Sequence, residues 1–563
     1  MYRSRALTGL IAAALLAVTG SFALATPGTA AGPELEVNSQ NPVTAEPAVS
    51  RPPTRSCTQT LATHFLSNDA TTGAAQNFTG TLAPPADCAG PWNKVVLDWT
   101  TSVQGRQYDR SGSLDIGSTQ VWFGTTYEPD PAGITYHFAK DITEYSSLLH
   151  TAEPFTGGIV NYTSSVYTGN YDQTVTVTYY QADRAHPAPA EPNGVVGLGS
   201  PNLDPSTPVA HLTATGLPRN IDRAYLEVYI KGNGCDEQWF TDVPNDVAAK
   251  YPPAQMCGNG PYREVDAAID GTPAGVTQYF PYIYTGGIVP TLWRPIPAVG
   301  TFDMSPELLD VTPFVGDLVN GGSHDIALSV PDLGDVWNLS ANLLLYTDPH
   351  AATTSGAMSS DNLTSTPVTT TSETSGADNA TTATVTSRRD WSISGWVRTS
   401  AGVVRTTVTQ HVDYRNTDTV TNGGFSQHIA QTDAGWTRSV SAGEPGKGQF
   451  ALPRTDLHTW SYPITITENA QVTDDNNFTL AGSVDMKRVL SDTTTNGLGL
   501  PSVTASSDEV SANGNDQRAN GQTVAADGDG WQRFVGDDDT GHCYRHYIAA
   551  AHGYVTAEQA GRC

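Results

Sequence analysis

Short runs in which apolar and polar residues alternate recur along most of this chain. Such alternation places successive side chains on opposite faces of a β-strand, and few segments carry the 3.6-residue period of a helix. The clearest runs are VVLDWT, TVTVTYY, DIALSV, NLLLYT, WSISGWV, VVRTTVTQHV and YPITITE. Only 15% of the residues are charged, and 53 glycines and 37 prolines supply turns. We therefore predict an all-β protein.

The first 31 residues have the character of a secretion signal. Arg3 and Arg5 precede the apolar run LTGLIAAALLAVTGSFALA, and small residues suited to cleavage follow it. No later stretch has the ~20 apolar residues of a membrane helix, so we expect a secreted, extracellular protein. With 57 acidic and 29 basic residues the net charge is −28, which repels nucleic acid and anionic membranes. We expect neither as a partner.

Six cysteines in an exported chain favour a set of local disulfides. None of them has the CxxC spacing of a zinc or thioredoxin-like site, and the histidines are scattered. We therefore expect no metal site. The predicted disulfides are Cys57–Cys88, Cys235–Cys257 and Cys543–Cys563.

A chain of 563 residues is long enough for three or four domains. Changes in composition place the boundaries, because Pro/Gly-rich and Ser/Thr-rich stretches are typical of linkers. We expect residues 349–387 to be a solvated connector or a loop with one edge strand. The predicted ranges are a signal peptide at 1–31, a disordered Pro-rich leader at 32–56, β domains at 57–183 and 209–348, a linker at 184–208, the connector at 349–387, and a β-sandwich-like domain with a supporting role at 388–563.

The segment 224–265 concentrates side chains that a strand alone does not require. Its first part, AYLEVYI, is predicted to be a strand with Leu226, Val228 and Ile230 on one face. The carboxylates and aromatics around it need another reason, and we interpret them as part of a site. They include Glu227, Glu237, Trp239, Phe240 and Glu264.

Two carboxylates are the main candidates for chemistry. Asp109 lies in GRQYDRSG, where Arg106 or Arg110 could hold it, and Glu237 follows Cys235 in CDEQWF. A surface ion pair for Asp109 and an ordinary loop acid for Glu237 remain open alternatives. No Ser-His-Asp arrangement is present in the sequence, so carboxylates must carry any hydrolysis. Carboxylates on separate domains meet only at the interface, a usual place for a ligand cleft.

A larger set of motifs runs in one order from Cys57 to about His350. It includes KVVLDW, GRQYDR, TYEPDPAGITYHFAKDITEYSSLL, YTGNYDQTVTVTYY, AYLEVYI, GNGPYREV, YIYTGG and LWRPIPAVGTFD. These motifs strongly resemble the peptide-N-glycosidase A family. The C-terminal part, from RRDWSIS to CYRHY, is similar to the tail of that family.

The resemblance implies two adjacent jelly-roll β-sandwich domains with the active site between them, plus a β-rich C-terminal domain. It implies hydrolysis of the amide between asparagine and the innermost N-acetylglucosamine of an N-glycan, leaving aspartate and releasing a glycosylamine. It implies no cofactor, and N-glycosylated peptides or proteins would be the substrates. We expect the protein to be a monomer. The alternative is a non-catalytic, lectin-like secreted protein, since jelly rolls also bind carbohydrate.

The resemblance also implies site residues. Asp109 matches the catalytic aspartate of a related bacterial amidase and would be the general base. Glu237 matches its catalytic glutamate, although the second cysteine close behind that glutamate is missing here. Glu128 is the candidate for a third carboxylate. The residues expected to bind substrate are Arg110, Trp239, Arg263, Glu264, Trp293 and Arg294, with both tryptophans as sugar platforms.

Overall fold

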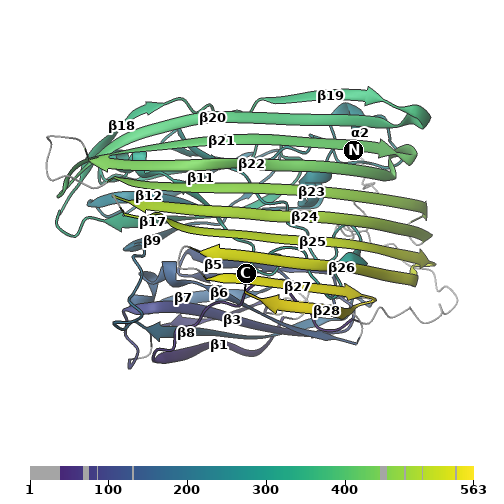
Figure 1. Cartoon of the computed structure of the whole chain (residues 1–563), viewed down its shortest axis with the longest axis horizontal. Coiled ribbons are helices and arrows are strands. Elements are labelled where there is room, and N and C mark those ends of the chain that lie inside the picture. Colours follow the sequence, from purple (N-terminus) through teal and green to yellow (C-terminus); the bar gives the residue numbers. More distant parts are fainter. Residues whose placement is uncertain are drawn as a thin grey trace, which may run out of the picture.

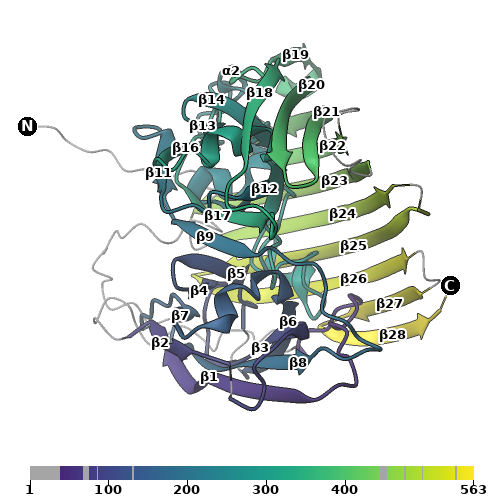
Figure 2. The same cartoon turned by 90° about the vertical axis from the view of Figure 1, so that its left-hand side faces the viewer.

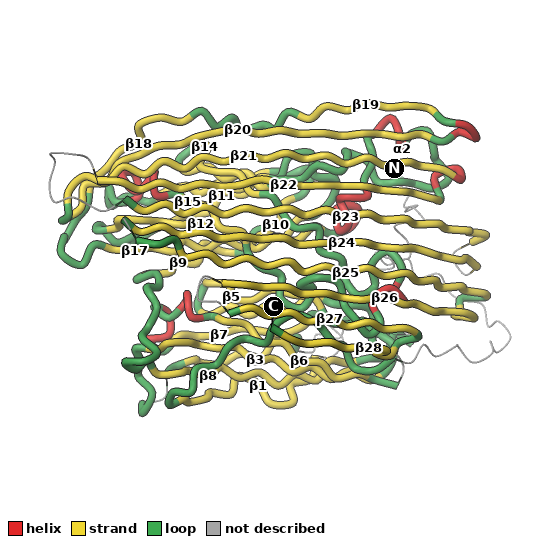
Figure 3. The backbone as a smooth tube through the Cα atoms, viewed as in Figure 1, coloured by secondary structure: helices red, strands yellow, loops and turns green. Residues whose placement is uncertain are grey.

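The computed structural model describes residues 39–67, 75–84, 86–129, 132–165, 167–443, 453–474, 477–497, 499–538 and 542–562. Strands dominate these residues and the helices are short (Figures 1 and 3). The prediction of an all-β protein is confirmed. None of the helices in these ranges has the length and apolar character of a membrane-spanning segment.

The first unit consists of two four-stranded sheets, with the orders β1-β8-β3-β6 and β2-β7-β4-β5. The sheets enclose an apolar core that includes Trp99 and Trp122. The predicted Cys57–Cys88 disulfide is present and ties β1 to the loop before β3. The elements are β1 (Ser56–Ser67), β2 (Asn77–Leu82), β3 (Trp92–Gln104), β4 (Ser111–Ile116), β5 (Thr119–Thr125), β6 (Ile134–Asp141), η2 (Thr143–Tyr145), η3 (Leu148–His150), β7 (Glu153–Ile159) and β8 (Asn170–Gln181).

The second unit repeats this strand order, as β10-β17-β12-β15 and β11-β16-β13-β14, with β9 added beside β17. We interpret both units as jelly rolls, because in each the first strand pairs with the last and the chain crosses between sheets at most turns. The elements are β9 (Gly194–Gly199), β10 (Asn202–Leu203), β11 (Val209–Ala214), β12 (Ile221–Gly232), η4 (Gly234–Thr241), α2 (Asn245–Ala248), β13 (Val265–Ile269), β14 (Thr272–Thr277), η5 (Pro290–Trp293), β15 (Glu307–Asp310), η6 (Thr312–Phe314), α3 (Val315–Leu318), β16 (His324–Ser329) and β17 (Trp337–Thr347).

The C-terminal part forms one 11-stranded antiparallel sheet rather than the predicted sandwich. Figure 2 shows both units on the same side of this sheet. Its inner face, the face turned toward the units, shares an apolar core with the second unit. The elements are β18 (Ser355–Asp361), β19 (Thr369–Ser375), η7 (Ala377–Asn379), β20 (Thr381–Thr399), β21 (Gly402–Thr421), η8 (Asn422–Gly424), β22 (Ser426–Gly443), β23 (Arg454–Asp474), β24 (Asn477–Asn496), β25 (Ser502–Ala519), β26 (Gln522–Asp538), β27 (Cys543–Ala551) and β28 (Tyr554–Gly561).

The leader, expected to be disordered over 32–56, instead packs against the protein where the structure describes it. The Ala45 backbone N–H donates to Gln532 Oε1 at 2.7 Å, and Arg51 pairs with Asp98. Composition could not predict these distant partners. Residues 1–38, which include the predicted signal peptide, and Cys563, with its predicted disulfide, lie outside the described residues.

Two further predicted linkers contribute strands to the sheets. The stretch 184–208 contains β9 and β10, which both pair with β17 of the second unit. The stretch 349–387 contains β18 and β19, which both pair with β20 at the edge of the C-terminal sheet. Both stretches therefore belong to ordered sheets instead of standing apart from them.

Strand β12 explains why the segment 224–265 is rich in polar side chains. Leu226, Val228 and Ile230 point into the core of the second unit, as predicted. The other face of β12 meets the first unit, where the Tyr145 hydroxyl donates a hydrogen bond to Glu227 Oε1 at 2.8 Å. The alternate residues of this strand therefore line the junction of the two units, and the strand leads directly toward Glu237.

Candidate active site

Two carboxylates of the first unit converge on a glycine of the second. Asp109, in the loop between β3 and β4, accepts a hydrogen bond from the Gly286 N–H at 2.8 Å. Glu128, in the loop after β5, donates its own N–H to Thr285 Oγ1 at 2.7 Å. A Cβ atom on Gly286 would lie 3.2 Å from both Asp109 Oδ2 and Glu128 Oε2. The residue at 286 therefore sits between the two side chains.

These carboxyls hold protons more tightly than exposed ones do. Burial raises the pKa of Asp109, while the Gly286 N–H and the charges of Lys231 and Arg110 oppose the rise. Burial raises the pKa of Glu128 to about 7, against the charge of Arg294 and with a further rise from Asp109. The backbone N–H bond favours the ionised form at Asp109. Of this pair, Asp109 is thus better placed to act as a base.

Glu237 approaches the same region from η4 and is half-buried. Burial raises its pKa to about 7, with the Asp109 charge adding to the rise and Lys231 opposing it. Glu237 also lines a hollow whose other side is formed by Gln427 and Glu468 of the C-terminal sheet. Asp109 therefore interacts with both Glu128 and Glu237, and residues of the C-terminal sheet lie beside Glu237.

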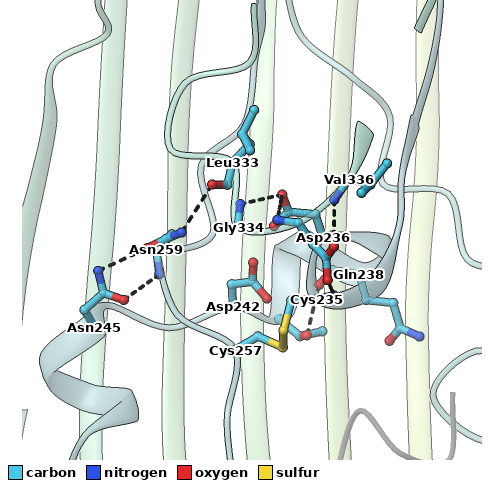
Figure 4. Close-up of a disulfide and its surroundings, with 12 residues drawn as sticks. Cys235, Asp236, Gln238, Asp242, Asn245, Cys257, Asn259, Leu333, Gly334 and Val336 are labelled. Carbon is cyan, nitrogen blue, oxygen red and sulfur yellow. Dashed lines mark hydrogen bonds between the residues drawn. A yellow bond between two sulfur atoms is a disulfide. The ribbon is translucent and has the colours of Figure 1, made fainter. Parts of the chain in front are cut away.

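Short loops hold η4 in place through a buried network (Figure 4). Asp236, next to Glu237, accepts hydrogen bonds from the Gly334 N–H at 2.7 Å and from Arg263 Nη2 at 2.8 Å. The predicted Cys235–Cys257 disulfide fixes the residue before it. Because the two residues that precede Glu237 are both anchored, the position of Glu237 depends on these structural contacts.

Removing that disulfide is expected to lower activity more than the yield of folded protein. The double variant Cys235→Ala/Cys257→Ala should lose about 3 kcal/mol of unfolding free energy, because the denatured loop is no longer closed. Its η4 segment should also become mobile, which displaces Glu237. Denaturant unfolding and glycopeptide turnover, both measured where the variant is fully folded, check this. Parent-level turnover in the folded variant would contradict the positioning role.

Four of the predicted substrate-binding residues are buried and cannot contact a sugar. The side chains of Trp239, Trp293, Arg263 and Glu264 are each at most 1% exposed. Both tryptophans belong to the core of the second unit, Arg263 bridges Asp236 and Asp242, and Glu264 is held by Arg389. The prediction that the two tryptophans are sugar platforms is therefore wrong. Large aromatic side chains occur both in cores and in sugar-binding sites, and sequence alone could not distinguish the two.

The two remaining predicted arginines do lie at the site. Arg294 Nη2 is 3.8 Å from Glu128 Oε2. Arg110 donates hydrogen bonds to Gln107 Oε1 at 2.7 Å and to the Tyr162 carbonyl at 3.0 Å. Arg110 is thus held in place by its own loop region and acts on Asp109 through its charge.

Residues that sequence reasoning missed complete the site. Lys231, on the β12 face that meets the first unit, donates to Ser111 Oγ at 3.4 Å and lies over the Tyr284 ring. Burial lowers its pKa, while the charges of Glu237 and Asp109 oppose the fall. Arg518 of β25 adds a positive charge that acts on Glu128. The alternation of β12 could have indicated Lys231, but nothing in the sequence links β25 to this site.

Gly286→Ala is expected to reduce turnover about 10-fold to 100-fold with little change in stability. The added methyl would press on both carboxylates and occupy the space between them, and small misplacements of catalytic groups are costly. Gly194→Ala in β9 is the matched control, because its nearest neighbour would be Leu345 Cβ at 3.9 Å. Steady-state rates and melting temperatures check this. Equal rates for both variants would show that the space at Gly286 does not matter.

Two family profiles and a curated relative match this chain in sequence. A family profile described as peptide N-acetyl-β-D-glucosaminyl asparaginase amidase A matches residues 42–364, and a profile of the C-terminal domain of the same family matches 382–452. A curated relative from Prunus dulcis, peptide-N4-(N-acetyl-β-glucosaminyl)asparagine amidase A, is 31% identical over an alignment of 401 residues. The match covers 68% of this chain and 69% of that protein.

The chain belongs to the peptide-N-glycosidase A family. Two solved structures resemble this chain more distantly. A structure of PNGF-II has a TM-score of 0.39 and 13% identity, covering 53% of this chain and 66% of the other. A structure of a peptide-N(4)-(N-acetyl-β-D-glucosaminyl)asparagine amidase has a TM-score of 0.34 and 13% identity, covering 52% and 96%. The family assignment rests on the sequence matches.

Proposed function

We propose that this chain is a secreted peptide-N-glycosidase. It hydrolyses the amide bond between asparagine and the innermost N-acetylglucosamine of N-glycosylated peptides or proteins. The observation that carries the proposal is the convergence of Asp109 and Glu128 on Gly286, with Glu237 interacting electrostatically with Asp109, in a chain of this family. Amide hydrolysis needs a base and an acid in one place, and this cluster offers both.

In this mechanism Asp109 is the general base. It accepts a proton from a water molecule as the water oxygen attacks the carbonyl carbon of the asparagine side chain. The Gly286 N–H keeps one carboxylate oxygen in place, which leaves the other free for water. The charges of Arg110 and Lys231 favour the ionised form that the base requires.

Glu237 is the general acid. With a pKa of about 7 it keeps its proton at mildly acidic pH and gives it to the amide nitrogen as the carbon–nitrogen bond breaks. The products are an aspartate side chain and a glycosylamine. Glu128 and Arg294 orient the amide, and the nearby positive charges offset the negative charge that develops on the carbonyl oxygen.

The proposal requires no cofactor and no partner beyond the glycosylated substrate, and it takes the protein to be a monomer. The lectin-like alternative gains no support from the family match. It also gives no reason for acidic side chains with raised pKa values at the junction of two units.

Mass spectrometry of an N-glycopeptide incubated with the protein in heavy-oxygen water tests the proposal. We expect asparagine to become aspartate with one heavy oxygen in the new carboxyl group, and the glycan to leave with its innermost N-acetylglucosamine. A peptide that keeps one N-acetylglucosamine would instead indicate cleavage of a glycosidic bond. Binding without any change of mass would favour the lectin-like alternative.

A further inference from the structure

The C-terminal sheet has an outer face, turned away from both units, that the proposed reaction does not use (Figures 1 and 2). Gly482, Gly514 and Gly528 are paired in register across β24, β25 and β26. Cβ atoms on these glycines would meet residues 288, 289, 291 and 292 on the inner face. Because side chains alternate along a strand, the residues flanking each glycine point outward.

These flanking residues line a hollow of about 330 Å³ on the outer face. We call it the outer hollow. It combines hydroxyl, amide and carboxyl groups in two rows. Each row runs across the strands, and neighbouring strands are about 4.8 Å apart. The polar residues that matter here are Thr467, Asn469, Asn513, Asn515, Asp527 and Asp529.

Most of these polar groups are available to a ligand. In the part of the chain that the structure describes, no hydrogen bond to protein is formed by the side chains of Asn469, Asn513, Asn515 or Asp529. Asp527 uses only Oδ1, which accepts from the Gly528 N–H at 2.9 Å and lies 2.7 Å from His552 Nδ1. The hollow therefore presents both donors and acceptors, arranged over the width of one or two sugar rings.

An aromatic pair lies on the outer face beyond the lining residue Asp529. Trp531 follows Asp529 by two residues on β26 and so lies on the same face. Its ring is 6.0 Å from that of Tyr547, and both residues are half-buried. The residues paired with Trp531 across the sheet are Ser511 and Ala549. Because these neighbours are small, the half-buried indole ring is suited to stacking on the apolar face of a sugar.

We propose that the outer hollow binds a neutral oligosaccharide. Asparagine and aspartate side chains match the hydroxyl groups of such a ligand, and Trp531 matches the C–H face of a ring. The acidic lining and the net charge of −28 oppose anionic ligands. The sheet separates this hollow from Arg294 and Glu128, so its ligand is not the bond being cleaved. The hollow would hold a second glycan of a glycoprotein.

Calorimetric titration with chitotriose and mannotriose, each added to the full-length protein, tests this proposal. Trp531→Ala should weaken binding of at least one sugar tenfold or more. Trp436→Ala is the matched control, because Trp436 is also half-buried on the outer face but stacks on His411, away from the hollow. It should change the affinity less than twofold. If Trp531→Ala misfolds, Asn513→Ala/Asp529→Ala replaces it with the same expectation.

Turnover of a short peptide carrying one glycan separates this proposal from the proposed function. Such a substrate is too short to engage both faces of the sheet, so Trp531→Ala should keep the parent rate within twofold. Absence of sugar binding in the parent, or equal weakening by Trp531→Ala and Trp436→Ala, would overturn the binding site while leaving the amidase intact. Sugar binding at the outer hollow without any turnover would support the hollow and refute the amidase.

Discussion

Asp109→Asn is expected to reduce turnover of an N-glycopeptide about a thousandfold while the protein stays folded. Asparagine keeps the shape of aspartate and can still accept the hydrogen bond from the Gly286 N–H. It cannot take a proton from water at any accessible pH. Binding of chitobiose should therefore be nearly unchanged, and only the chemical step should fail. Rates with a glycopeptide, together with calorimetric binding of chitobiose, measure the two effects separately.

Asp115→Asn provides the control for this experiment. Asp115 lies on β4 in the same unit, and burial raises its pKa to about 6. Its replacement also removes a partly buried carboxyl, so it should alter stability in a comparable way but leave the rate within about twofold. If Asp109→Asn keeps a tenth of the parent rate, Asp109 is not the base. If Asp109 forms only a surface ion pair, Asp109→Asn should lower the free energy of unfolding by at most ~1 kcal/mol and leave the rate unchanged.

Turnover of the parent is expected to fall about tenfold for each unit of pH above 7. Glu237 has a pKa of about 7, raised chiefly by burial, so its protonated form is present below that pH and disappears above it. As the proposed general acid, it works only when protonated. Glu237→Gln keeps an N–H donor at every pH but has no proton to transfer. The variant should be slower at pH 6 and should lose most of the decline above pH 7.

Two further variants decide which carboxyl causes the decline. Burial also gives Glu128 a pKa of about 7, so Glu128→Gln is compared directly. If that variant flattens the profile and Glu237→Gln does not, the acid is Glu128. Glu307→Gln controls for general effects, because burial raises the pKa of Glu307 to about 7 on β15. It should leave the pH profile of the parent unchanged.

The strands could be predicted because their signal is local. Alternation alone predicted the two faces of β12, and burial of Leu226, Val228 and Ile230 confirms one of them. What covers a strand is not a local property. The same pattern in the last third of the chain fits a sandwich and a single sheet equally well, and the structure has a single sheet whose inner face is buried against the second unit.

The candidate site was predictable in part for the same reason. Asp109 and Glu237 stand in short segments with distinctive neighbours, and the structure brings their charges together. The tryptophans were misassigned because an aromatic next to an acid is typical of both sugar sites and cores. Lys231 and Arg518 were missed because each reaches the site only through pairing between distant parts of the chain.

The C-terminal sheet also determines when, during synthesis of the chain, the candidate site can be completed. Asp109, Glu128 and Glu237 are synthesised in the first half of the chain, but Glu468 and Arg518, which border them, come from β23 and β25. A nascent chain that ends before residue 454 carries every proposed catalytic carboxyl and lacks both of these neighbours. The catalytic surroundings are therefore assembled only near the end of synthesis, through contacts between residues far apart in sequence, which form slowly.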